Sequence, residues 1–392
     1  MNNSTIVKPY SLAIDATNLR RGGGVTHLIE LLRSANPKIH NFERIVIWGP
    51  ANSLKLIDDK PWLVKHNPPA LERGLLHRTI WQSFCLSKAA REEGCSVMFV
   101  PGGSYAGSFF PVVTMSQNLL PFEISELKRF GWSFLSFKLL LLRFTQSRSF
   151  IKSDGVIFLT EYARRRVESV TGNLRGQTSI VSHGLNNRFS NAPKPQKKIS
   201  EYNSINPYRL LYVSIIDQYK HQWHVVEAVS ILRKKGFPIK LDLVGPAYKP
   251  ALHRLNGKIM SVDKERLWVN YHGAVPFEEL HHKYAQADLG LFASSCENMP
   301  NILLETMAAG LPIACSNKGP MPEMLKESGI YFNPEQPENI ANALYRMISS
   351  PTLRTKLAEE SYLESQKYSW NRCADETFSF INKVVYEFNQ KQ

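Results

Sequence analysis

The sequence is poor in cysteine and has none of the patterns that mark disulfide frameworks or zinc sites. Its five cysteines form no Cys-x-x-Cys pair, and their number is odd. Free thiols are typical of a reducing compartment. No apolar run approaches the roughly 20 residues of a membrane span, and the amino terminus has no basic region followed by a long apolar stretch. We therefore expect a cytoplasmic protein with free thiols and no membrane-spanning segment.

A dinucleotide-binding fingerprint is also absent, because no Gly-x-Gly-x-x-Gly follows the first predicted strand. This absence disfavours a nicotinamide-dependent dehydrogenase. The composition is that of a globular protein, with 43% hydrophobic and 21% charged residues among 392. Such a length is sufficient for two domains that each have a full core.

Positive charge is concentrated in the first half of the chain. Residues 1–190 contain 24 Lys and Arg against 13 Asp and Glu, whereas the remainder contains 24 against 21. The amino-terminal half is therefore the one expected to meet an anionic partner.

Within that half, the segment from Leu127 to Ser153 has no acidic residue and interleaves bases with aromatic side chains. Five apolar side chains of this segment would share one face of a helix: Phe130, Phe134, Phe137, Leu141 and Phe144. Such a pattern is typical of an element that lies on an anionic membrane surface, and a pair of core helices with exposed basic ends is the alternative. Nucleic acid is not favoured, because no binding fold accompanies the charge. The predicted membrane contacts are Lys128, Arg129, Trp132, Phe134, Lys138 and Arg143.

Short apolar runs alternate with helical patterns along both halves, which predicts an α/β fold with two Rossmann-like domains, each built on a parallel sheet. The predicted strands of the first half are 11–14, 44–48, 97–100, 112–115, 155–159 and 178–181, and those of the second half begin with 210–213, 240–244, 268–272 and 289–293. We expect an amino-terminal domain at 1–190, a linker at 191–207, a second domain at 208–369 and a carboxy-terminal helix at 370–392.

The most informative stretch lies between Asp288 and Glu323. An apolar strand ends in Ser294 and Ser295, a polar turn follows, and a helix then runs to Gly310. The turn would lie at the carboxyl end of a parallel strand, where open α/β sheets bind ligands, and the start of the helix would offer N–H groups to an anion. The turn contains Glu297 and the helix contains Glu305.

With these flanking elements the stretch resembles the donor-sugar motif of retaining glycosyltransferases of family 4, which have the GT-B fold of two Rossmann-like domains facing each other across a cleft. The resemblance implies that Glu297 binds hydroxyls of the transferred hexose and that Glu305 binds the ribose diol of the nucleotide. A carboxylate suits both roles because it accepts two hydrogen bonds from a diol. The turn residues that would line the donor site with them are Asn298, Met299, Pro300 and Asn301.

Other segments resemble the family less closely. Gly22, Gly23 and Gly24 precede a predicted helix, as does the family's glycine loop beside the donor phosphates. Lys220 stands where a lysine neutralises the leaving diphosphate. The chain departs from the family at Ser214 and Ile215, which replace an expected Gly-Arg pair. His272-Gly273 matches the segment that contacts the nucleotide base.

On the acceptor side, Gln117 and Asn118 occupy the position where many relatives carry His-Asp. Amides do not titrate at neutral pH, so neither residue is a general base. The resemblance implies that the departing phosphate takes the acceptor proton instead. No Asp-x-Asp occurs in the chain, so we expect no metal and no cofactor beyond the nucleotide-sugar substrate.

These observations predict a metal-independent hexosyltransferase that uses a nucleotide-sugar. GDP-mannose is the expected donor because the residues of the motifs resemble those of O-antigen mannosyltransferases. The expected acceptor is a lipid-linked or growing glycan of surface polysaccharide or lipopolysaccharide synthesis, at the inner face of the cytoplasmic membrane. A UDP-hexose donor and a GT-B-shaped sugar-nucleotide epimerase are the alternatives. A non-catalytic protein that binds a sugar or a membrane is a third, which the presence of Glu297, Glu305 and Lys220 disfavours.

Overall fold

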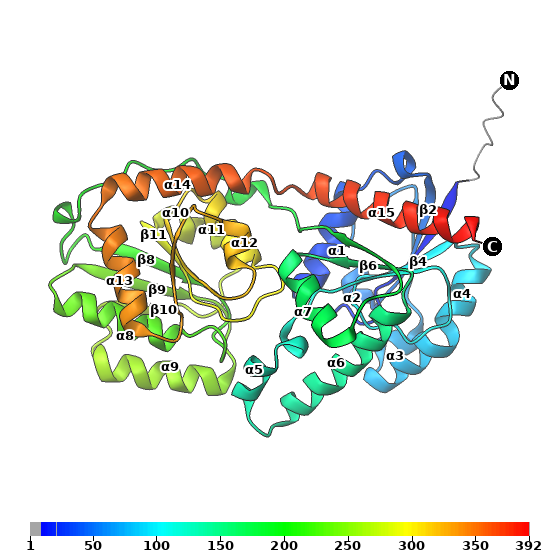
Figure 1. Ribbon diagram of the computed structural model, residues 1–392, viewed down its shortest axis with the longest axis horizontal. Helices are drawn as coiled ribbons and strands as arrows, with labels where there is room; N and C mark the ends of the chain where they lie inside the picture. Colours follow the sequence, from blue (N-terminus) through cyan, green and yellow to red (C-terminus); the bar gives the residue numbers. More distant parts are fainter. Residues whose placement is uncertain (1–8, 21, 392) are drawn as a thin grey trace. The chain divides into compact units, whose positions relative to one another are not determined.

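The computed structural model describes residues 9–20 and 22–391, which form two compact units (Figure 1). Unit 1 comprises the described residues of Met1–Phe122, Phe134–Gly184 and Ser369–Gln392. Unit 2 comprises Glu123–Ser133 and Leu185–Tyr368. The chain therefore leaves unit 1 twice and returns to it twice.

Unit 1 is built on one parallel sheet of seven strands in the order β3-β2-β1-β4-β5-β6-β7. The central strands are buried throughout, as expected for a parallel sheet with helices on both faces. In chain order the strands are β1 (Tyr10–Asp15), β2 (Phe42–Trp48), β3 (Leu63–His66), β4 (Val97–Val100), β5 (Val112–Met115), β6 (Gly155–Phe158) and β7 (Gln177–Ile180).

The helices of unit 1 include one that comes from the far end of the sequence. They are α1 (Gly23–Ser34), α2 (Ala51–Leu54), α3 (Leu75–Trp81), α4 (Ser87–Glu92), α6 (Phe134–Lys152), α7 (Glu161–Thr171) and α15 (Trp370–Gln390). Helix α15 lies beside α1 (Figure 1) and against β6. At Gly155 a Cβ atom would meet Val384 at 2.9 Å, so the absence of a side chain in β6 lets α15 approach the sheet closely.

Unit 2 is built on a second parallel sheet, of six strands in the order β10-β9-β8-β11-β12-β13. Its strands are β8 (Tyr208–Val213), β9 (Ile239–Val244), β10 (Val269–Tyr271), β11 (Leu289–Phe292), β12 (Ile313–Ser316) and β13 (Ile330–Phe332). Its helices are α5 (Ile124–Leu127), α8 (Gln222–Lys234), α9 (Lys249–Val262), α10 (Leu280–Gln286), α11 (Asn301–Ala308), α12 (Met321–Leu325), α13 (Pro337–Ile348) and α14 (Pro351–Ser365).

The predicted α/β class with two parallel sheets is confirmed. Two predicted boundaries differ from the units. The helix expected as a separate element at 370–392 lies in unit 1, and residues 123–133, expected in the first domain, lie in unit 2. Strands β3 and β13 and helix α9 were not predicted, because the two strands are short and only partly buried and the helix carries Gly257 in a largely polar sequence.

The stretch 191–207, predicted to be a linker, packs on unit 2. Its main anchor is Arg354 of α14, which is fully buried and donates to the carbonyl oxygens of Met347 and Ile348 at 2.8 and 2.7 Å. The same guanidinium donates to Gln196 Oε1 at 3.0 Å. A buried charge needs such partners, and here the partners include the stretch itself.

Two findings bear on the environment of the chain. All five cysteines are free thiols. None of the helices within residues 9–20 and 22–391 combines the length and the apolar content that crossing a membrane requires.

Candidate functional site

The predicted catalytic residues Lys220 and Glu297 form an ion pair in unit 2. Lys220 lies in the loop between β8 and α8, and Glu297 lies in the turn between β11 and α11, so adjacent strands bring them to the same edge of the sheet. The Lys220 ammonium contacts Glu297 Oε1 and lies 5.1 Å from the ring centroid of Tyr219. Lys220 is 6% exposed. The site thus holds one desolvated positive charge beside one carboxylate, and a ligand could engage both.

Glu305 lies in α11, the helix that follows the turn with Glu297. The hydroxyl of Tyr284 donates to Glu305 Oε2 at 3.2 Å. Burial raises the pKa of Glu305 to about 8, and this hydrogen bond opposes the shift. Near neutral pH the carboxyl group is therefore largely protonated until a ligand supplies donors that favour its ionised form.

The residues Asn298, Met299, Pro300 and Asn301 connect the two glutamates. Asn298 and Met299 are buried, and α11 begins at Asn301. The first turn of α11 follows the turn that holds Glu297, so its N–H groups lie at the same sheet edge. This arrangement matches the expected strand, turn and helix.

Two further predicted donor residues lie on neighbouring strands of unit 2. Ser214 follows β8 directly and is buried. A Cβ atom at Gly245, whose φ is +144°, would meet the Ser214 carbonyl oxygen at 2.2 Å, so glycine is required for β9 to end beside it. His272 follows β10, and its Nε2 lies 2.7 Å from Asp242 Oδ1. Gly273 has a φ of +70°, and its carbonyl oxygen accepts from the Gly245 N–H at 2.8 Å.

The predicted residues of the amino-terminal half meet in unit 1. Gly22, with a φ of +80°, precedes α1, and Gly23 and Gly24 form its first turn. A Cβ atom at Gly24 would meet Gln117 Oε1 at 2.8 Å, so the glycine loop lies against the loop that follows β5. Asn118 is exposed, and its Oδ1 accepts from the Leu120 N–H at 3.2 Å.

Gln117 has a buried histidine partner that the sequence did not reveal. Its Nε2 lies 3.1 Å from Nδ1 of His27, in α1. Burial, together with the nearby ring of His183, lowers the pKa of His27 well below its usual value, so His27 is neutral. An amide donor requires Nδ1 to be the acceptor. Gln117 and its partner His27 are therefore both neutral.

The residues predicted to contact a membrane fall into two sets. Lys138 and Phe134 are exposed in α6, where Phe137 and Phe144 are also exposed (66% each), and Arg143 donates to the Pro121 carbonyl oxygen at 3.3 Å. Three of the predicted contacts, Lys128, Arg129 and Trp132, precede α6 and belong to unit 2.

The expectation that Phe130 shares the exposed face of α6 is wrong. The chain turns at Gly131, whose φ is +57°, and α6 begins only at Phe134. The ring of Phe130 instead lies 6.0 Å from that of Tyr248.

The sequence did not assign four polar residues beside the Lys220–Glu297 pair to the donor site: Glu126, Arg129, His221 and Ser295. The Ser295 hydroxyl donates to Glu126 Oε2 at 2.7 Å and lies 2.9 Å from His221 Nε2. Glu126 also accepts from Arg129 Nε at 2.7 Å. No local sequence pattern predicts these contacts, since Glu126 and Ser295 lie 169 positions apart.

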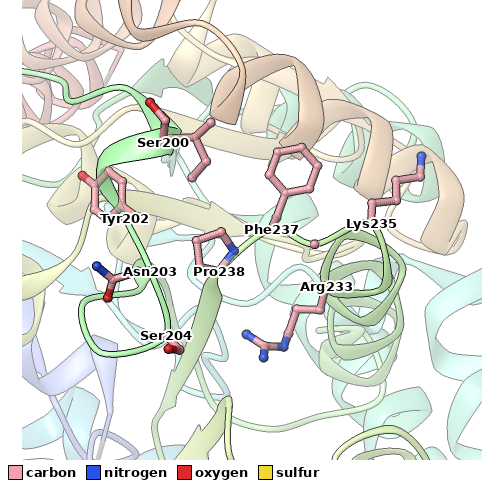
Figure 2. A pocket seen from close by; sticks show the side chains of 10 residues that line it. Ser200, Tyr202, Asn203, Ser204, Arg233, Lys235, Phe237 and Pro238 are labelled. Atoms are coloured by element: carbon pink, nitrogen blue, oxygen red, sulfur yellow. The ribbon is translucent and has the colours of Figure 1, made fainter.

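A cavity of about 640 Å³ lies elsewhere in unit 2 (Figure 2). It is lined by Tyr202, Arg233 and Phe237, next to the start of β9. That is the opposite edge of the sheet from Glu297, so this cavity is not part of the candidate site. Among the residues that the structure describes, no group of three or more His, Cys, Asp or Glu side chains is arranged to hold a metal ion.

Comparison with known proteins matches the second half of the chain to a family. Residues 207–350 match the model of glycosyl transferases group 1. O-antigen chain mannosyltransferase B of Escherichia coli is 27% identical over 112 residues, which are 29% of this chain and 29% of that protein. The matched segment thus spans less than a third of the length of that relative.

Solved structures match nearly the whole chain. Sucrose-phosphate synthase from Thermosynechococcus elongatus has a TM-score of 0.75 at 15% identity, covering 98% of this chain and 100% of its own. HepE of Anabaena, in complex with UDP-glucose, has a TM-score of 0.67 at 15% identity with the same coverage. At such identities the likeness shows the fold, and the predicted GT-B fold is confirmed.

Proposed function

We propose that the protein, whose residues 207–350 match the model of glycosyl transferases group 1, transfers a hexose from a nucleotide-sugar to a glycan acceptor with retention of configuration. The observation that carries the proposal is the Lys220–Glu297 pair at the same sheet edge as Glu305. One cation and two carboxylates at this edge match the three parts of the donor: the diphosphate, the hexose and the ribose.

In the proposed reaction the bond between the anomeric carbon and the β-phosphate oxygen breaks. The acceptor oxygen forms the new bond on the same face of the sugar, and its proton passes to the departing phosphate. Lys220 stabilises the negative charge that develops on that phosphate. Glu297, which neutralises Lys220 before the donor binds, accepts hydrogen bonds from hexose hydroxyls once it is bound.

The neutral pair Gln117 and His27 supports a mechanism without a protein base. Gln117 has no titrating group, and His27 accepts its hydrogen bond at 3.1 Å in a buried setting that keeps the ring neutral. Catalysis then rests on the positioning of the two substrates and on charge stabilisation at the leaving group.

We propose GDP-mannose as the donor, with UDP-hexose as the alternative. The O-antigen mannosyltransferase of Escherichia coli supports the first, and the UDP-glucose complex of HepE supports the second. A screen of GDP-sugars and UDP-sugars for hydrolysis and for thermal stabilisation of the protein, without added metal, separates them. Stabilisation by UDP-glucose and not by GDP-mannose would overturn the mannosyl assignment.

The same screen, run with Glu297→Ala, tests the function itself. We expect turnover to fall while affinity for the free nucleotide stays within about twofold, since the partner of Glu297 is the sugar. Equal losses of affinity for the nucleotide-sugar and the bare nucleotide would contradict the role of Glu297. Absence of turnover by the parent protein on every donor would contradict the enzyme assignment.

We further propose that the acceptor is linked to a lipid and that unit 1 meets an anionic membrane surface through α3 and α6. Exposed apolar side chains occur on both helices: Leu75 (60%), Leu76 (71%) and Ile80 (49%) on α3, and Phe134 (83%), Phe137 (66%) and Leu141 (53%) on α6. A cluster of exposed apolar side chains is typical of an interaction site.

Tyr105 links α6 to α4. Its N–H donates to Ser149 Oγ of α6 at 2.8 Å, and its hydroxyl lies 3.4 Å from Ser87 Oγ of α4, which continues α3 through a π-helical turn. Exposed bases accompany the apolar side chains, Arg73 before α3 and Lys138 within α6. Bases beside aromatic side chains complement anionic headgroups, at about 1 kcal/mol for each base near the surface.

Sedimentation with vesicles of phosphatidylglycerol or of phosphatidylcholine tests this surface. We expect the parent to bind the anionic vesicles, more weakly as salt rises, and Phe134→Ser/Phe137→Ser/Lys138→Glu to lose binding. A variant of unit 2 with matched changes, Met260→Ser/Leu267→Ser/Lys264→Glu, is the control and should bind like the parent. Equal sedimentation of all three proteins would contradict the membrane proposal and leave the transferase proposal standing.

A further inference from the structure

The segment Glu123–Ser133, here called the strap, leaves unit 1 after Phe122 and packs within unit 2. It contains α5 and a short 3-10 turn, Lys128–Phe130. Two contacts anchor its second half: Arg129 Nη2 donates to Glu335 Oε1 at 2.8 Å, and the ring of Phe130 lies beside Tyr248. The strap is thus fixed to unit 2 along its length.

Glu126 is, with Glu123, one of the two buried charged groups of the strap. It is 6% exposed, and Arg129 donates to both of its oxygens, at 2.7 and 3.2 Å. A buried carboxylate is costly unless it is paired and hydrogen-bonded. The third donor to Glu126 is the Ser295 hydroxyl, at 2.7 Å.

The hydrogen bonds that run from Glu126 have a definite direction. Ser295 has one hydroxyl proton, and the charged acceptor at 2.7 Å is preferred over the Tyr219 carbonyl oxygen at 3.3 Å. The Ser295 oxygen can then accept from Nε2 of His221, 2.9 Å away. Burial, followed by the charge of Arg129, lowers the pKa of His221 to about 3, so the ring is neutral and its proton resides on Nε2.

His221 also has an unfavourable backbone conformation that its surroundings must hold. Its φ is +53°, in the left-handed region that is unfavourable for a residue other than glycine. The Ser295 N–H donates to the Tyr219 carbonyl oxygen at 2.8 Å, which ties the Tyr219–His221 loop to the turn after β11. The loop and the turn are therefore joined by two hydrogen bonds, one through the Ser295 N–H and one through the Ser295 hydroxyl. Glu126 orients that hydroxyl.

Lys220 lies inside the joined loop, and Glu297 lies two residues after Ser295. Both partners of the ion pair are thus attached to the network that ends on the strap. We propose that Glu126 is a positioning residue for the donor site, which sets Ser295 and His221 and through them the placement of Lys220 and Glu297. The expected effect of Glu126 on turnover rests on the proposed function, whereas its effect on the structure of the loop and the turn does not.

The structural consequence is measured by hydrogen exchange of the full-length protein. In Glu126→Ala, peptides covering Tyr219–His221 and Ser295–Asn298 should exchange faster than in the parent. In Glu126→Gln, whose amide oxygen still accepts from Ser295, exchange in these peptides should stay nearer to the parent. The matched control is Glu335→Gln, which removes the negative charge of the other partner of Arg129 and leaves the Glu126–Ser295 contact in place, so it should match the parent there.

The kinetic consequence separates positioning from general stability. We expect Glu126→Ala to lower kcat about tenfold, as contacts of a coupled network do, with nucleotide affinity within about twofold because Glu305 is not attached to the network. Adding Ser295→Ala to Glu126→Ala should cost little more. Parent-like exchange and kcat in Glu126→Ala, or equal losses in Glu335→Gln, would overturn the inference. If the parent transfers no sugar, the proposed function fails while the exchange result still decides the positioning role.

Discussion

The predicted site residues at the carboxyl edges of the two sheets differ in charge. In unit 2 this edge holds charges: the Lys220–Glu297 pair, Glu305 and the Glu126–Arg129 pair. In unit 1 the predicted residues at the corresponding edge are the glycines at the start of α1 and the amide of Gln117, which lies beside the neutral ring of His27; Asp15, the last residue of β1, lies at this edge as well. On the proposed function, unit 2 stabilises the leaving group and unit 1 receives the acceptor.

The difference also extends to the surfaces. Unit 1 exposes apolar side chains on α3 and α6. Most helices of unit 2 bury their apolar side chains in one large core with the strands of the sheet. On the proposed function, unit 2 performs the chemistry and unit 1 brings the acceptor. The comparison fails if changes in unit 1 prove as costly to the chemical step as changes in unit 2.

The largest expected effect is that of Lys220→Ala. Transfer should slow by roughly 10²–10³, as when one positioned donor to a developing oxyanion is lost. The measurement is kcat under saturating donor. Lys326→Ala is the control, because Lys326 forms an exposed ion pair with Glu364 at 2.7 Å and should leave kcat within about twofold. Activity of Lys220→Ala close to the parent would assign the leaving-group role to another cation.

Glu305→Ala should weaken nucleotide affinity about tenfold to a hundredfold, from roughly 1.5–3 kcal/mol for lost hydrogen bonds to a charged group. The raised pKa of Glu305, about 8, adds a pH dependence. Ribose hydroxyls stabilise the ionised carboxylate, so binding lowers this pKa, and affinity should rise with pH up to about 8 and level off above it.

Titration calorimetry with the free nucleotide between pH 6 and 9 measures this rise. Glu305→Gln should bind more weakly than the parent with no such pH dependence. A parent affinity that falls or stays level over this range would show that Glu305 does not bind the ribose as a carboxylate.

On the unit 1 side, Gln117→Ala should cost about tenfold or less in kcat, well below the 10²–10⁴ that loss of a general base costs. The shape of the pH profile should not change, because Gln117 has no proton to lose. A loss in kcat as large as that of Lys220→Ala would place part of the chemistry in unit 1 and break the comparison.

The smallest expected effect is that of chelation. Activity should be unchanged by EDTA, since the leaving-group charge is met by Lys220 in the proposed mechanism. The assay compares initial rates with EDTA, and with EDTA followed by excess Mg²⁺. Complete loss and recovery would mean that a metal ion stabilises the diphosphate.

Much of the fold was predictable because its strands are buried and therefore continuously apolar. Strands β4 and β5 match their predicted bounds, and β8 and β9 differ by one or two residues at one end. The strands that were missed, β3 and β13, lie at sheet edges, where partial burial removes the apolar signal.

The candidate site was predictable in its residues but not in its contacts. The flanking strand and helix identify Glu297 and Glu305 from sequence, yet their partners, Lys220 and Tyr284, are set by the order of strands in the sheet. Glu126 could not be predicted at all, because no motif surrounds it and its contact with Ser295 spans 169 positions. Roles of the individual residues stay predictions until the variants are measured.

The attachment of α15 to unit 1 has a consequence for synthesis on the ribosome. The seven strands of unit 1 have all been made by Ile180, but the helix that contacts β4 and β6 is the last element of the chain. At roughly 5–20 residues per second, about 10–40 s pass between Gly184 and Ser369. During that interval the face of the sheet beside Gly155 lacks its cover, whereas the second sheet can already assemble with its helices. The usual order, in which the amino-terminal domain is completed first, is thereby reversed.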